Sequence, residues 1–120
     1  MTPSSVPPGG EVQQGEVVLV RFVFSDESGA KRRPVVVLST QAYHRGRQEA
    51  IVAAITSNVQ RLLAGDHLIA GWQEAGLLFP SVATGIVRTV KQAMIERRVG
   101  WMPVEDMQGI QTRIRDALGL

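Results

Sequence analysis

Residues 31–39 read Lys-Arg-Arg-Pro-Val-Val-Val-Leu-Ser, and residues 51–57 read Ile-Val-Ala-Ala-Ile-Thr-Ser. Both stretches are rich in β-branched residues, which is typical of strands. The first places Arg33 before a proline at the start of its strand, and the second ends its strand on the hydroxyl of Thr56. A guanidinium offers a planar fork of donors to phosphate oxygens, and a threonine hydroxyl adds another hydrogen bond. We therefore predict that Arg33 and Thr56 form a phosphate-binding pair.

The pattern around these stretches predicts a protein that is mainly β with a C-terminal helix. Apolar residues recur every three or four positions from Val104 to Leu118, after a proline suited to the first helical position. Residues 72–78 predict helical turns, whereas 58–71 is ambiguous, with a possible helical turn at 59–64 and a short strand at 66–70. A turn-rich loop is expected from 25 up to Pro34, and another loop at 41–48. The predicted strands are 16–24, 35–38, 49–56, 81–90 and 93–99. Short strands with one terminal helix indicate a small, strongly bent barrel.

Composition indicates a single globular domain. The chain has 120 residues, is 44% hydrophobic and contains no cysteine, which excludes disulfides and thiolate metal sites. No apolar run approaches the roughly 18 residues of a membrane span, and the N-terminus lacks the pattern of a secretory signal. Residues 1–14 are rich in Pro, Gly, Ser and Gln, so we expect a flexible arm there and a domain at 15–120. A cytoplasmic location is expected.

Positive charge is concentrated in the middle of the chain. The net charge is only +2, but residues 31–98 carry ten basic and four acidic side chains. The terminal regions on either side are net negative. This distribution is expected if the partner is a polyanion.

Five segments in order resemble the MazF/PemK family of toxin endoribonucleases. They are Gly15–Val20, Arg33–Ser39, Ile51–Ser57, Trp72–Ser81 and Val87–Val90, the last leading to Val99 and Gly100. The resemblance implies an SH3-like barrel that assembles as a homodimer. It further implies a sequence-selective, metal-independent endoribonuclease that cleaves single-stranded mRNA and is neutralised by a cognate, MazE-like antitoxin. No cofactor is implied.

The resemblance also assigns roles to individual residues. Arg33 matches the main catalytic residue of the family, and Thr56 matches a hydroxyl residue that holds the scissile phosphate against it. A hydroxyl is a poor general base, so positioning is the expected role of Thr56. Further candidates for RNA contact are Lys31, Arg32, Ser57, Asn58, Glu27 and Arg88.

The chain departs from the family in its acid and base groups. An Arg-x-Asp pair of PemK-like members corresponds here to residues 83–85, Ala-Thr-Gly, which carry no ionisable group. The histidine that some members carry before Arg33 is also missing, and Glu27 is the remaining candidate for the base. His44 and His67 fall outside the matching motifs, and the chain has no histidine or carboxylate pattern typical of a metal site.

Two other functions remain open on the sequence alone. A CcdB-like gyrase poison uses a related fold but depends on a tryptophan near the extreme C-terminus, whereas residues 117–120 here read Ala-Leu-Gly-Leu. A non-catalytic RNA-binding barrel would explain the charge and the strands, but not the coincidence of Arg33 and Thr56 with catalytic positions. Trp72, Leu77 and Phe79 are the predicted receiving surface for an antitoxin, although large aromatic residues more often pack in a core.

Overall fold

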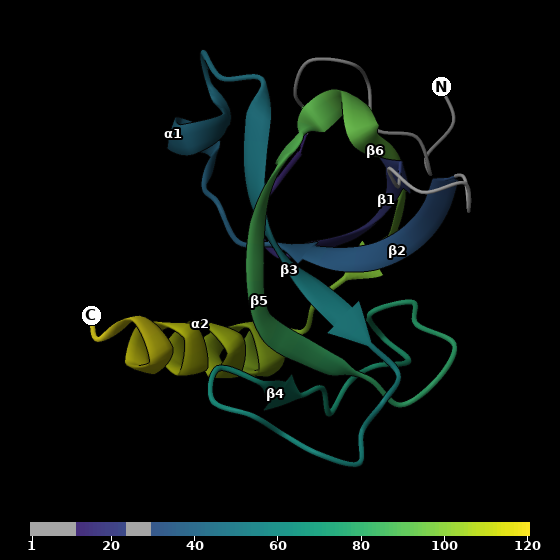
Figure 1. Ribbon diagram of the computed structural model, residues 1–120, viewed down its shortest axis with the longest axis vertical. Helices are drawn as coiled ribbons and strands as arrows, with labels where there is room; N and C mark the ends of the chain where they lie inside the picture. Colours follow the sequence, from purple (N-terminus) through teal and green to yellow (C-terminus); the bar gives the residue numbers. More distant parts are fainter. Residues whose placement is uncertain (1–11, 24–29) are drawn as a thin grey trace.

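The computed structural model describes residues 12–23 and 30–120, whose strands form one antiparallel sheet with a helix packed against it (Figure 1). The spatial order of the strands is β4-β5-β3-β2-β1-β6. The elements in chain order are β1 (Glu16–Val23), β2 (Ala30–Val37), α1 (Gln41–His44), β3 (Glu49–Thr56), β4 (His67–Leu68), β5 (Val82–Lys91), the 3-10 helix η1 (Gln92–Met94), β6 (Ile95–Trp101) and α2 (Val104–Leu118). The expected mainly β fold with a C-terminal helix is confirmed.

The sheet curls so strongly that β1, β2, β3, β5 and β6 surround a common interior (Figure 1). Alternate residues of a strand face opposite sides, and the interior takes one set from each of these five strands. This barrel core consists of Val12, Val18, Val20, Phe22, Val35, Val37, Ala50, Val52, Val90 and Ile95. Val12 is fully buried here, and of the predicted N-terminal arm only residues 12–14 are described.

A second core lies between the other face of the sheet and α2. Val17, Val36 and Ala53 are paired across three neighbouring strands and share this face, and Met107 and Ile110 of α2 pack against them. Glu105 and Asp106 lie in the first turn of the helix, where carboxylates are favourable, and Gly119 ends it in the left-handed conformation. The helix therefore covers part of the outside of the barrel.

Pro34 explains why β2 and β3 separate at one end of the barrel, which we call the open rim. The Leu38 amide donates to the Ile51 carbonyl at 2.8 Å, and hydrogen-bonded pairs recur at every second position of an antiparallel ladder. Along this register Pro34 would face Ile55 in such a pair, but proline has no N–H to donate. The pairing of β2 with β3 accordingly ends at Val35. Residues 30–34 of β2 pair only with β1. An opening therefore forms there between β2 and β3, which are paired from Val35 to Val37.

Four local predictions differ from the structure. β2 begins at Ala30 rather than at 35, because β1 continues far enough to pair with it there. The expected loop at 41–48 contains α1, and residues 59–64 form no helical turn. Residues 72–78 form hydrogen-bonded turns rather than helix, for example from the Leu77 amide to the Trp72 carbonyl at 3.0 Å.

Within the two described ranges, no helix combines the length and the apolar character needed to span a membrane.

Candidate active site at the open rim of the barrel

A cavity of about 940 Å³ occupies the opening between β2 and β3. Its floor continues the barrel core through Val35, Val52 and Ala54, and the segment from Gly76 to Ser81 contributes most of another wall. Arg33 and Thr56 both line it, so the structure brings together the two residues predicted as a pair. Ser57 lines the same cavity.

Arg33 lies at the mouth of the cavity because of its place on β2. It is directly opposite Val20 of β1 and two residues from Val35, so it continues the row of side chains that fills the barrel. Unlike those residues, Arg33 is exposed. Among the described residues, no carboxylate forms an ion pair with it. Its guanidinium is therefore available to an anion in the cavity.

Thr56 ends β3 on the opposite side of the opening and is half-buried. Its Oγ1 accepts a hydrogen bond from the Asn58 backbone amide at 3.1 Å. This contact fixes the oxygen, and a hydroxyl that accepts one hydrogen bond can still donate its own hydrogen. Thr56 can therefore donate to an anionic ligand from a fixed position.

Arg88 supplies a second guanidinium from β5. Its Cζ lies 4.7 Å from the centroid of the Phe22 ring, a cation–π contact that holds the planar group at the cavity wall. Phe22 is almost fully buried in the barrel core, so the surface on which Arg88 rests is rigid. The donors at the edge of the guanidinium remain free to bind phosphate.

Arg97 of β6 is the third arginine of the cavity, opposite Leu19 of β1. Among the described residues, the lining includes these three arginines and neither a carboxylate nor an imidazole. Such a lining favours anions and offers no described side chain that could readily act as a general base at neutral pH.

The apolar wall of the cavity depends on a close approach between the 71–77 turns and β6. A Cβ added at Gly100 would lie 2.3 Å from the Ala75 carbonyl oxygen, so only glycine permits this contact. Leu77 packs against the second core, whereas Leu78 and Phe79 are 83% and 62% exposed beside the cavity. Large exposed apolar groups next to arginines can receive bases or apolar side chains of a partner.

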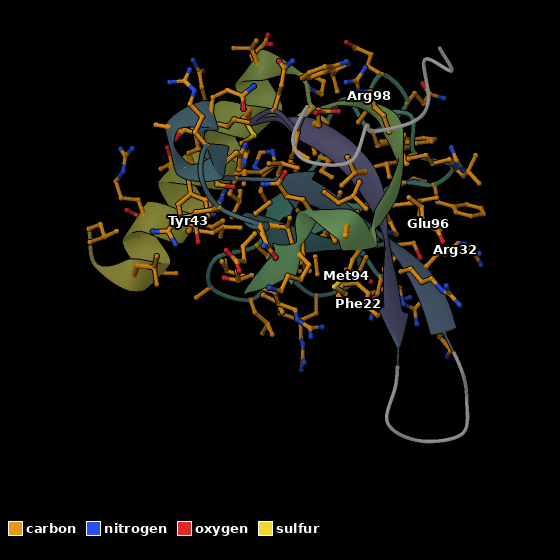
Figure 2. All side chains as sticks on the ribbon, turned by 90° about the horizontal axis from the view of Figure 1, so that it is seen from above. Phe22, Arg32, Tyr43, Met94, Glu96 and Arg98 are labelled. Atoms are coloured by element: carbon orange, nitrogen blue, oxygen red, sulfur yellow. The ribbon has the colours of Figure 1, made fainter. Side chains whose placement is uncertain are left out.

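The remaining predicted contact residues lie elsewhere or outside the described residues. Arg32 is on the face of β2 opposite to Arg33, where its Nε donates to Glu96 Oε1 at 2.5 Å (Figure 2). Lys31 and Asn58 do not line the cavity. Glu27 lies outside the described residues.

Sequence reasoning missed Phe22 and Arg97. Phe22 lies on the barrel-facing side of β1, and its contact with Arg88 depends on how far the barrel curls. Arg97 reaches the cavity through the register of β6 with β1, which shifts at two bulges. No local signal in the sequence locates those shifts.

Both histidines lie away from the cavity. His44 is buried, and its Nε2 and the Ser39 Oγ are 2.6 Å apart, so it connects α1 to the end of β2. His67 Nε2 is 2.8 Å from Asp106 Oδ1. Burial alone would raise the pKa of Asp106, but hydrogen bonds from His67 and from the amides of Gly71 and Ala70 outweigh it and hold that pKa below its usual 3.8.

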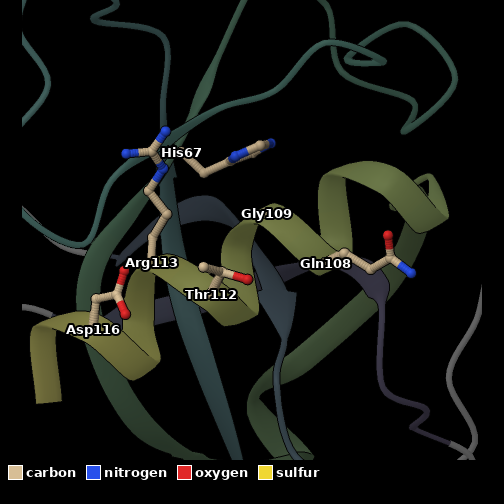
Figure 3. Close-up of a pocket in the computed structure, with 6 residues that line it drawn as sticks. All are labelled: His67, Gln108, Gly109, Thr112, Arg113 and Asp116. Carbon is tan, nitrogen blue, oxygen red and sulfur yellow. The ribbon is translucent and has the colours of Figure 1, made fainter. Parts of the chain in front are cut away.

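His67 also lies over α2 at a shallow hollow lined by helix residues (Figure 3). A Cβ added at Gly109 would come within 2.3 Å of His67 Cε1, so the ring packs directly on the helix backbone. This arrangement joins β4 to α2 and is structural. No group of histidine and carboxylate side chains suited to a metal ion occurs within residues 12–23 and 30–120.

Comparison with known proteins relates this architecture to a family. Residues 13–118 match the model of the PemK-like, MazF-like toxins of type II toxin–antitoxin systems. Comparison with the curated proteins found no match.

Solved structures with similar folds include a MazE–MazF complex from Deinococcus radiodurans, with 19% identity over 91% of this chain and 96% of that one and a TM-score of 0.75. An endoribonuclease in complex with its cognate antitoxin from a mycobacterial species has 18% identity over 91% and 96%, with a TM-score of 0.71. The Mycobacterium tuberculosis toxin MazF-mt6 has 23% identity over 88% and 97%, with a TM-score of 0.70. At these identities the structural likeness concerns the fold, whereas the family model spans nearly the whole sequence. The chain belongs to the family of PemK-like, MazF-like toxins of type II toxin–antitoxin systems.

Proposed function

We propose that this protein is a sequence-selective, metal-independent endoribonuclease that cleaves single-stranded mRNA. The observation that carries the proposal is that Arg33 and Thr56, from two separated strands, line one cavity together with Arg88. A phosphate in that cavity would meet two guanidiniums and one fixed hydroxyl. The family of the chain and the endoribonuclease activity named for two similar structures support the same reaction.

In the proposed reaction the 2′-hydroxyl oxygen of the substrate attacks the adjacent phosphorus. A bond forms between the 2′-oxygen and phosphorus as the bond from phosphorus to the 5′-oxygen breaks, which gives a 2′,3′-cyclic phosphate and a 5′-hydroxyl. Charge grows on the phosphoryl oxygens in the transition state, where Arg33 stabilises it. Thr56 and Arg88 hold the phosphate in line for attack.

The proton of the 2′-hydroxyl must leave during attack, and a proton must reach the 5′-oxygen. Glu27 is a candidate for the base, since residues 83–85 provide no ionisable group. Arg33 can donate a hydrogen bond to the leaving 5′-oxygen, which takes its proton from water. With few acid and base groups, most of the catalysis would come from positioning and charge stabilisation.

The identity of the nucleophile tests this reaction. Purified protein is incubated with a long single-stranded RNA, and the cut positions and fragment ends are determined by mass spectrometry. We expect cyclic phosphate ends, no effect of EDTA, and no cleavage where the ribose before a cut is replaced by deoxyribose. Cleavage at the deoxyribose would exclude the 2′-hydroxyl as nucleophile. Binding without any cleavage would indicate an RNA-binding barrel.

We further propose that the protein acts as a growth-inhibiting toxin and is neutralised by a cognate antitoxin. Two similar structures are complexes of a toxin with such a partner. The basic lining of the cavity suits an acidic peptide, and Leu78 and Phe79 offer the apolar anchors that coupled folding requires. Phe79 belongs to the receiving surface predicted from the sequence, whereas Trp72 and Leu77 contribute mainly to the second core.

Competition distinguishes this mode of inhibition from others. The protein encoded next to this gene should suppress cleavage and displace labelled RNA from the wild-type chain. Phe79→Ala should weaken its inhibition, whereas Val104→Ala, an equally exposed apolar residue on α2, should not. Simultaneous binding of RNA and that protein would contradict competition at the cavity.

A further inference from the structure

The outer face of β1, β2 and β6 carries arginines that the proposed cleavage reaction does not use. Arg21 alternates with the barrel-facing residues of β1, so it points away from the barrel. It lies directly opposite Arg32 of β2, and Leu19, on the same face, lies directly opposite Arg97 of β6. Arg21, Arg32 and Arg97, which we call the outer arginine row, are all exposed.

The row keeps its charge at a cost to stability. Like charges directly opposite each other on antiparallel strands destabilise the pair, and Arg21 faces Arg32 in this way. Among the described residues, the one carboxylate paired with the row is Glu96, which binds Arg32 Nε at 2.5 Å (Figure 2). Three positive charges therefore face solvent with one described negative charge between them. An arrangement that stability disfavours is expected where binding uses it.

The row is continuous with the cavity that holds Arg33. Leu19, Pro34 and Arg97 lie on the outer face and also line the cavity, because the cavity passes through the opening between β2 and β3. A strand whose phosphate lies at Arg33 can leave through this opening and cross the three arginines.

The chemistry of the row suits RNA better than an acidic peptide. A peptide that folds on binding needs apolar anchors, and no large apolar side chain is exposed on β1 or β2 over residues 16–22 and 31–37, where the side chains are described. On β6 the one such side chain is Trp101, four residues beyond Arg97. Nucleic acid needs only phosphate contacts to be held and steered along a basic track.

We propose that the outer arginine row binds phosphates of single-stranded RNA beyond the bond that is cut. This inference rests on the proposed function, since it extends the path of the same substrate. It assigns Arg21 and Arg97 to RNA binding and makes Glu96 a residue that weakens binding by occupying Arg32.

Affinity for an uncleavable RNA tests the row. The probe is a fully 2′-O-methylated single-stranded oligonucleotide of mixed sequence, titrated with the full chain at several salt concentrations. Arg21→Gln should weaken binding about two- to fivefold and reduce the salt slope by about 0.7. Glu96→Gln should strengthen binding. The matched control is Arg113→Gln, which removes the same charge from the exposed side of α2 and should change neither (Figure 3).

A structural role of Arg21 would give a different result. Because Arg21 faces Arg32, Arg21→Gln should keep or raise the melting temperature while binding weakens. With cleavable RNA its KM should rise at unchanged kcat, because the contact is made before and during the reaction alike.

The outcomes separate the two proposals. If the wild-type chain cleaves RNA but Arg21→Gln and Glu96→Gln both bind like Arg113→Gln, the row is not an RNA site and the proposed function stands. If Arg21→Gln affects only inhibition by the antitoxin, the row belongs to a protein partner. A wild-type chain that neither binds nor cleaves RNA would overturn both proposals.

Discussion

Arg33 combines exposure with a fixed place in the barrel, and this combination predicts the outcome of removing it. Arg33→Ala leaves no cavity in the core, so the fold should be unchanged. Loss of one transition-state donor costs about 3–4 kcal/mol, which corresponds to a rate a few hundredfold lower. Single-turnover cleavage of RNA, with circular dichroism to check folding, measures this effect.

Two variants make the Arg33 result specific. Arg33→Lys keeps the charge but loses the fork of donors, so it should recover only part of the rate. Arg45→Ala removes an exposed arginine beside α1 that does not line the cavity, and should cleave like wild type. A folded Arg33→Ala protein with near-wild-type activity would show that the site is assigned wrongly.

The stack of Arg88 on Phe22 predicts that shape matters at this position as well as charge. Arg88→Lys keeps the charge but loses the planar contact with the ring, and we expect kcat/KM to fall about fivefold. Arg47→Lys is a matched control, because Arg47 lies 4.5 Å from the Tyr43 ring in the same kind of contact, outside the cavity. Equal cleavage by the two variants would remove Arg88 from the site.

At the scale of single residues, the sequence predicts the position of a side chain when that position depends only on the residue's own strand. That Arg33 and Thr56 line one cavity could be predicted because each belongs to a short motif of its own strand. Arg32 was grouped with Arg33, but consecutive residues of a strand face opposite sides, and the structure places Arg32 beside Glu96. Arg97 depends on a bulged register between strands far apart in the chain, which no local pattern specifies.

The first turn of α2 holds the chain around β4 through Asp106, whose carboxylate accepts from the Ala70 and Gly71 amides at 2.8 and 2.9 Å. Asp106→Asn replaces one of the two acceptor oxygens with an NH2 group that faces another donor, and should lower the free energy of unfolding by about 2 kcal/mol. Glu105→Gln changes the exposed neighbouring carboxylate and should change that free energy far less. Urea denaturation of the three proteins compares them.

The lowered pKa of Asp106 fixes the pH at which this contribution disappears. A carboxyl whose pKa is lower in the folded state stabilises the fold fully above its unfolded pKa of about 4. That stability is lost as the pH falls through the lowered folded pKa. The difference in unfolding free energy between wild type and Asp106→Asn should therefore be constant near pH 6 and shrink below about pH 4. A difference that grows in acid would contradict this assignment.

Pro34 predicts what happens if β2 regains a backbone donor. Pro34→Val supplies an N–H opposite the Ile55 carbonyl, so the ladder between β2 and β3 should extend by one pair and narrow the opening. We expect slower cleavage and a new amide at position 34 that is protected from hydrogen exchange. Rapid exchange of that amide with unchanged cleavage would show that the proline does not cause the separation.

Among the elements, long periodic segments were predictable and connections were not. Helix α2 and strands β1, β3, β5 and β6 lie close to their predicted ranges, because their apolar patterns match the cores they fill. The turns at 71–77 follow no period. Their shape comes from packing against β6, where Gly100 permits contact with the Ala75 carbonyl.

At the scale of the whole molecule, the surface predicts self-association. The exposed part of β5 includes Ile86 and Val87, and other large apolar side chains are exposed in the 59–68 region. Burying such groups is the usual drive for forming a dimer. Light scattering should give twice the mass of one chain, and the melting temperature should rise with protein concentration. A monomer at all concentrations would contradict the homodimer that the family resemblance implies.

The two edges of the sheet are poorly suited to pairing with other chains, and this matters when the protein is abundant. A long, flat edge strand invites pairing with other chains, which leads to aggregation. Here one edge consists of the two-residue β4 and, beyond it, of β5, which carries Arg88 and Lys91. The other edge, β6, is bent by bulges at Glu96 and Val99 and carries Glu96, Arg97 and Arg98 in succession. Neither edge offers a straight, uncharged template. The protein should therefore resist fibril formation even when it accumulates without its partner.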